Sequence, residues 1–113
     1  MPAEAEAYFN RGNTYLATGQ YDQAIADYTK ALELNPQDAL AYNNRGLAYF
    51  YLKGEYDKAW EDVSKAQELG FQINPKFLED LRKASGRQRY TIFILNDAIN
   101  NFYRGATPIC KGV

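Results

Sequence analysis

Two stretches of this chain, Ala7-Tyr8-Phe9-Asn10-Arg11-Gly12-Asn13-Thr14-Tyr15 and Ala41-Tyr42-Asn43-Asn44-Arg45-Gly46-Leu47-Ala48-Tyr49, are identical at six of nine positions. The offset between them is 34 residues. Residues 19–24 recur as residues 54–59 at an offset of 35, so the second copy carries one extra residue before Gly54. A fixed period of this length indicates a repeat architecture in which each unit is one supersecondary element.

The apolar spacing predicts two helices in each copy. In the first helix of the first copy, Tyr8, Gly12 and Tyr15 share one face, and Gly19 ends the helix because glycine readily adopts a positive φ. The second helix is expected from about Tyr21 to Leu34. Asn35-Pro36 then stops it, and Pro36 can open the following helix. The stripe that the second helix should bury consists of Ala24, Ile25, Tyr28, Ala31 and Leu32.

This pattern of tyrosine, glycine, alanine and leucine positions, closed by a proline, resembles the tetratricopeptide repeat, a helix-turn-helix unit. The second copy follows it with Tyr42, Gly46, Tyr49, Tyr56 and Ala59, and departs at residues 70–71, where the family usually has proline. The resemblance implies an all-α fold, a short α-solenoid of antiparallel helix pairs. It places the first repeat at 3–38 and the second at 39–72, with the first helices lining a concave surface that holds a peptide or protein partner.

The rest of the chain is expected to close the solenoid. Asn74-Pro75 is a helix start and Gly86 a helix end, which predicts a capping helix at 74–86. Residues 87–113 form a C-terminal extension with an amphipathic helix at about 88–104 and a frayed tail, although residues 90–95 alone could also form a strand. Lys and Arg number nine against 13 Asp and Glu in residues 1–86, but four against one in residues 87–113.

Composition excludes several classes of function. The chain has 113 residues, a net charge of −1 and no histidine, which removes histidine-based catalysis and histidine metal sites. The single cysteine, Cys110, has no activating histidine and lies in the expected tail. No phosphate-binding loop, cofactor motif or metal-ligand spacing is present. We therefore predict a non-enzymatic, cytoplasmic protein without cofactors that binds neither nucleic acid nor membrane.

Asparagine and aromatic residues gather on the outward side of the first helices, where lysine and glutamate would be ordinary. Because asparagine is a poor helix former, its presence suggests another use. A carboxamide both donates and accepts, which suits the backbone of an extended peptide. The alternative is that these asparagines only cap helices or contact solvent. The predicted peptide-binding residues are Phe9, Asn10, Asn13, Asn43, Asn44, Leu47 and Tyr51.

One variant of the family grips the C-terminal carboxylate of its partner. Asn13 and Asn44 match two positions of that motif, but Phe9 stands where a cation is needed. Pro75 and Glu79 stand at the two further cation positions. The resemblance therefore implies a ligand that is not recognised through its terminal charge.

Two functions remain open from the sequence. The first is a protein–protein interaction module that binds an extended segment on the concave face. The second is self-association, in which the C-terminal helix docks into the groove of its own chain or of a neighbouring chain to form homo-oligomers. The opposite net charges of residues 1–86 and 87–113 motivate this second function.

Overall fold

The computed structural model describes residues 3–52 and 54–86. Within them the chain folds into helices without strands, which confirms the predicted all-α class. The extension at 87–113, with its predicted helix, lies outside the described residues. The helices are α1 (Ala3–Ala17), α2 (Tyr21–Leu34), α3 (Ala39–Tyr51), α4 (Tyr56–Glu68) and α5 (Pro75–Ser85).

The helix ends follow local signals in the sequence. Gly19 closes α1 with φ of 78°, and the amide of Gln20 reaches back to the Tyr15 carbonyl at 2.9 Å. This is a left-handed C-terminal cap that a side chain would strain. Asn74 caps α5 by accepting hydrogen bonds from the amides of Lys76 and Phe77, at 2.8 and 3.4 Å. The expected break at Gly19 and the capping helix are thus confirmed.

The start of α3 does not use Pro36. The helix begins at Ala39 and not at Pro36, because the Asp38 carboxylate caps it by accepting from the Ala41 amide at 3.2 Å. An acceptor at the N-cap satisfies an amide that has no partner within the helix. Pro36 therefore stays in the turn between α2 and α3.

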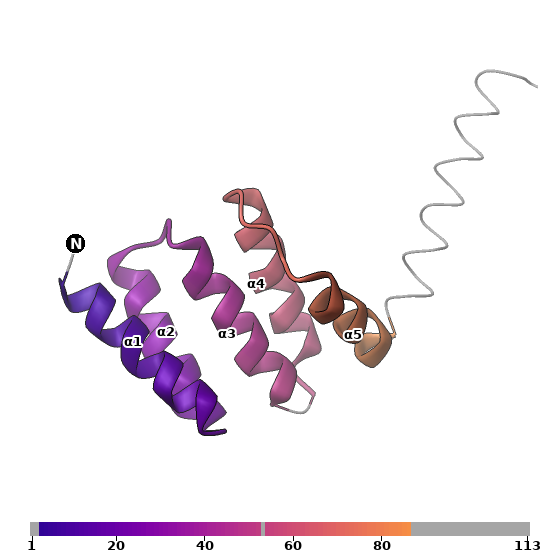
Figure 1. The fold of residues 1–113 in the computed structure, drawn as a ribbon, viewed down its shortest axis with the longest axis horizontal. Helices are drawn as coiled ribbons and strands as arrows, with labels where there is room; N and C mark the ends of the chain where they lie inside the picture. Colours follow the sequence, from indigo (N-terminus) through magenta and orange to yellow (C-terminus); the bar gives the residue numbers. More distant parts are fainter. Residues whose placement is uncertain (1–2, 53, 87–113) are drawn as a thin grey trace, which may run out of the picture.

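The helices pack as antiparallel pairs. Helix α1 pairs with α2 and α3 with α4, while α2 also lies against α3 and joins the pairs. In Figure 1 the first helices, α1 and α3, run side by side, and α5 follows α3 at the far end of the stack. One buried cluster holds Ala24, Tyr28 and Ala48, and a second holds Ala59, Val63, Ala66, Ile73, Phe77 and Leu81. Helix α5 thus covers the apolar side of α4, as a capping helix should.

A bidentate ion pair recurs in each repeat. The Arg11 guanidinium donates to both carboxylate oxygens of Asp27 at 2.7 and 2.8 Å, and Arg45 donates to both oxygens of Asp62 at 2.8 Å. Each pair joins the first helix of a repeat to its second helix. Arg45 also donates to the Thr29 hydroxyl at 3.0 Å and so ties the two repeats together.

Candidate functional site

A row of hydrogen-bonded carboxamides crosses from α1 to α3. The Asn43 amide donates to Asn44 Oδ1 at 3.1 Å, and Asn44 Nδ2 donates to Asn13 Oδ1 at 3.0 Å. All three side chains are half-buried, so they are accessible from one side. We call Asn13, Asn43 and Asn44 the amide row. The structure therefore brings together three of the predicted site residues.

A core tyrosine fixes the orientation of the amide row. The Tyr28 hydroxyl donates to Asn13 Oδ1 at 2.5 Å, although the ring is fully buried. Burial raises the pKa of Tyr28 to about 12, so the hydroxyl stays protonated and available as a donor. In the sequence, Tyr28 is predicted only as part of the buried apolar stripe of α2. A tyrosine at a core position could have predicted this contact, because a buried tyrosine hydroxyl usually has a hydrogen-bond partner.

Tyr28→Phe should lower the free energy of unfolding at pH 7 by about 1 kcal/mol, the usual net value of one hydrogen bond. The pH dependence gives the sharper test. Because the folded pKa of Tyr28 is about 12 against 10 for the ordinary group, its contribution is present below pH 10 and is lost as the pH rises to 12. Urea unfolding followed by circular dichroism at pH 7 to 11.5 measures both effects. The difference should shrink above pH 10 and reverse sign before pH 11.5, because a shift of about two pKa units outweighs one hydrogen bond. A constant difference would contradict the assignment.

Phe9 and Asn10 lie apart from the amide row. The Phe9 ring packs against the Tyr28 ring with centroids 5.9 Å apart, so it is half-buried beside the core. Asn10 is exposed, and its side chain makes no hydrogen bond to any described residue. Although Asn10 and Asn44 are repeat equivalents, Asn44 meets Asn13. Contact between neighbouring helices depends on their stagger and not on repeat position.

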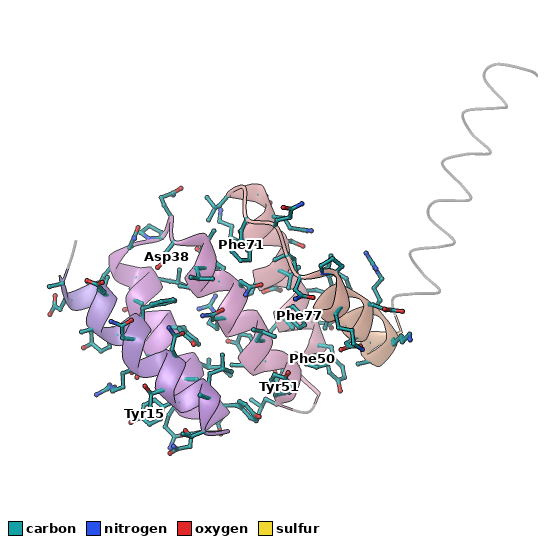
Figure 2. The ribbon with its side chains drawn as sticks, in the orientation of Figure 1. Tyr15, Asp38, Phe50, Tyr51, Phe71 and Phe77 are labelled. Atoms are coloured by element: carbon teal, nitrogen blue, oxygen red, sulfur yellow. The ribbon has the colours of Figure 1, made fainter. Side chains whose placement is uncertain are left out.

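Leu47 and Tyr51 border a pocket between α3 and α5. The α3/α5 pocket has a volume of about 240 Å³. Figure 2 shows Phe50, Tyr51 and Phe77 gathered where α3 faces α5. Neither Phe50 nor Phe77 is among the residues predicted to bind peptide, because the pocket depends on how α5 packs. The pocket is lined by Asn43, Leu47, Phe50, Tyr51, Asn74, Lys76, Phe77 and Asp80.

The cations of the carboxylate-binding variant are missing from their aligned positions. Pro75 is the first residue of α5, and the Glu79 carboxylate lies 3.4 Å from Lys83 Nζ. Lys76 does reach the pocket, but its ammonium lies 3.0 Å from the Asp80 carboxylate, which raises the pKa of Lys76. The charge at the rim is therefore already balanced.

Other chemistry has little support in this part of the chain. Across residues 3–52 and 54–86, no three His, Cys, Asp or Glu side chains come close enough to hold a metal ion together. No helix in the same residues has the length and apolar character to cross a bilayer. The predicted absence of catalytic activity stays a prediction.

Stacked antiparallel helix pairs with small residues at their contacts define a helical-repeat protein of the α-solenoid type. The chain belongs to the tetratricopeptide repeat family, which matches it at residues 5–38 and again at residues 27–61. Repeats of this family are generally non-catalytic, so the described part of the chain is a protein–protein interaction module. This confirms the resemblance in the sequence.

Several curated proteins are similar to the chain. The Protein SGT1 homolog of Oryza sativa subsp. japonica is 37% identical over 90 residues, which cover 80% of this chain and 20% of the relative. Mitochondrial import receptor subunit TOM70 of Rattus norvegicus is 35% identical over 91 residues, which cover 75% of this chain and 14% of the relative. Human serine/threonine-protein phosphatase 5 is 44% identical over 45 residues, which cover 40% of this chain and 9% of the relative. The chain thus spans a fifth or less of the length of these relatives.

Proposed function

We propose that the chain binds an extended peptide segment of a protein partner along the face formed by α1, α3 and α5. The observation that carries this proposal is the amide row, in which Asn13, Asn43 and Asn44 are held in fixed orientations by one another and by Tyr28. Amides held in this way offer donors and acceptors that match a peptide backbone without depending on its side chains. Phe9, Asn10, Leu47 and Tyr51 would border the same segment.

The charges and the comparisons agree with this proposal. At the rim of the α3/α5 pocket, Lys76 is ion-paired with Asp80, so a terminal carboxylate gains little there. One relative, TOM70, carries a name that records assembly with other proteins, an import receptor subunit. Self-association through residues 87–113 stays a prediction, since those residues lie outside the described part.

The test replaces both ends of the hydrogen bond between α1 and α3. We expect the double variant Asn13→Ala, Asn44→Ala to reduce recovery of co-purifying proteins about tenfold. The backbone carbonyl of the bound peptide would lose its amide donors, and such a hydrogen bond contributes about 1–1.5 kcal/mol to binding. The full chain serves as immobilised bait in a cell extract, and bound proteins are quantified by mass spectrometry.

The matched control is Gln23→Ala, which removes an exposed carboxamide from α2. It should leave recovery unchanged. Circular dichroism must show the same helix content in all three baits. Equal recovery by the double variant and the unmodified chain would exclude the amide row as the binding surface.

A further inference from the structure

The α3/α5 pocket has the size of one amino-acid side chain. Its volume is about 240 Å³. Sites that enclose a drug-sized molecule usually measure roughly 300–1,000 Å³, whereas an apolar cavity of roughly 150 Å³ is enough for benzene. The pocket therefore suits a single ring or a branched aliphatic group.

The apolar wall of the pocket is already ordered. Phe50 stands edge-on to Phe77 with ring centroids 5.5 Å apart, and edge-on to Tyr51 at 5.2 Å. Tyr51 also stacks on Tyr21 at 5.4 Å, yet 53% of its surface stays exposed. A wall held by its own contacts loses little side-chain entropy on binding. When an apolar group of a ligand covers the exposed surface of this wall, the burial of apolar area favours binding.

The pocket is continuous with the amide row. Asn43 lines the pocket and donates to Asn44, whose amide donates to Asn13. Asn13 Oδ1 already accepts two hydrogen bonds, one from Tyr28 and one from Asn44. A carboxamide oxygen has two lone pairs, so Asn13 has only its N–H groups left to offer. The ligand atom that meets Asn13 must therefore be an acceptor.

Charge decides which acceptor is favoured. The ammonium of Lys76, at the pocket rim, lies 3.0 Å from the Asp80 carboxylate. Residues 1–86 carry 13 acidic side chains against nine basic ones. This excess of negative charge disfavours binding of a ligand carboxylate beside Asp80. A neutral backbone carbonyl fits the Asn13 amide better than a carboxylate does.

We propose that the α3/α5 pocket is the specificity site of this surface and receives one large apolar side chain, aromatic or leucine. The side chain belongs to an internal, extended peptide that has no acidic residue beside it. A carbonyl of the same peptide accepts a hydrogen bond from Asn13 Nδ2. This inference rests on the proposed function and specifies the partner of the same surface.

The test is a selection of random heptapeptides displayed on phage against the full chain. Each heptapeptide is placed between Gly-Ser linkers, so that it offers no free terminus. We expect selected sequences to share one Phe, Trp, Tyr or Leu and to be depleted of Asp and Glu. Selected peptides should bind Tyr51→Ser about tenfold more weakly, because one wall of the pocket is lost.

The control is Leu40→Ser, which removes a similarly exposed apolar side chain from the other end of α3, outside the pocket. Its affinities should match those of the unmodified chain. Peptides that bind Tyr51→Ser and the unmodified chain equally would overturn the pocket assignment while leaving peptide binding intact. Enrichment of sequences resembling residues 87–113 would assign the pocket to the chain's own end and overturn the partner assignment. A selection that yields no binding peptide would overturn the proposed function as well.

Discussion

Arg45→Leu should destabilise the folded chain by about 3–5 kcal/mol, the range observed when one partner of a buried ion pair is removed. Only 19% of the Arg45 side chain and 6% of the Asp62 side chain are exposed. The substitution leaves the Asp62 carboxylate buried without its partner, and it also removes the hydrogen bond from Arg45 to Thr29 across the repeats. The first loss acts within the second repeat, between α3 and α4, and the second acts on the contact between the two repeats.

The destabilisation caused by Arg45→Leu should become smaller as the pH falls. Burial raises the pKa of Asp62, and the hydrogen bond and charge of Arg45 counteract that rise. Without Arg45 the pKa of Asp62 rises further, so the neutral acid is preferred in the folded state. A group with a raised folded pKa contributes stability at low pH that is lost as the pH rises through that pKa. The variant should therefore recover stability relative to the unmodified chain as the pH falls below neutrality.

The matched control is Arg11→Leu in the first repeat. Arg11 makes the same bidentate pair with Asp27, but 60% of its side chain is exposed. Once Arg11 is removed, water can reach the Asp27 carboxylate, so we expect a much smaller loss than for Arg45→Leu, as for ion pairs near the surface. Urea unfolding followed by circular dichroism between pH 4 and 7 measures both variants. Equal losses in the two repeats would show that burial of the pair does not set its cost.

The helices themselves could be predicted because their signals are local. Gly19 marks a left-handed cap, Asn74 and Pro75 mark a helix start, and the alanine stripe of α2 marks the buried face. Each signal acts within a few residues of the chain, where sequence spacing translates directly into geometry. The first residue of α3 is harder to predict, because two competing signals, Pro36 and Asp38, lie two residues apart.

The site was less predictable because it depends on distances between helices. The amide row joins Asn44 to Asn13, and the choice of Asn13 over Asn10 follows from the stagger of α1 against α3. The α3/α5 pocket needs Phe77 from a helix outside both repeats. Repeat alignment finds equivalent positions, but contacts between repeats join positions that are not equivalent.

Gly12→Ala should lower the free energy of unfolding by about 2 kcal/mol, within the range for overpacking a filled core. A methyl group at Gly12 would lie 2.8 Å from Tyr28 Cε1 and 2.9 Å from Cδ1. The Tyr28 ring is fully buried and its hydroxyl is tied to Asn13, so it has no room to withdraw. The overlap outweighs the gain of about 0.8–1 kcal/mol that alanine normally brings to a helix interior.

Gly46→Ala, at the equivalent position of the second repeat, should be neutral or slightly stabilising. A methyl group there would lie 3.4 Å from the Ala59 carbonyl oxygen and from Asp62 Cβ, and 3.5 Å from Val63 Cγ2, which is close but tolerable contact. The two glycines are equivalent in sequence, so the opposite signs arise from the residue across the helix pair. That residue is Tyr28 in the first repeat and Val63 in the second.

A double-mutant cycle isolates this cause, since it measures the coupling between two residues in contact. Tyr28→Val gives the first repeat the residue that the second repeat has, at a large cost in buried area. In that background Gly12→Ala should no longer destabilise, because the ring that its methyl group meets is gone. Thermal and urea unfolding of the four proteins give the coupling. If Gly12→Ala costs the same with valine as with tyrosine at position 28, then contact with the ring is not what requires glycine on α1.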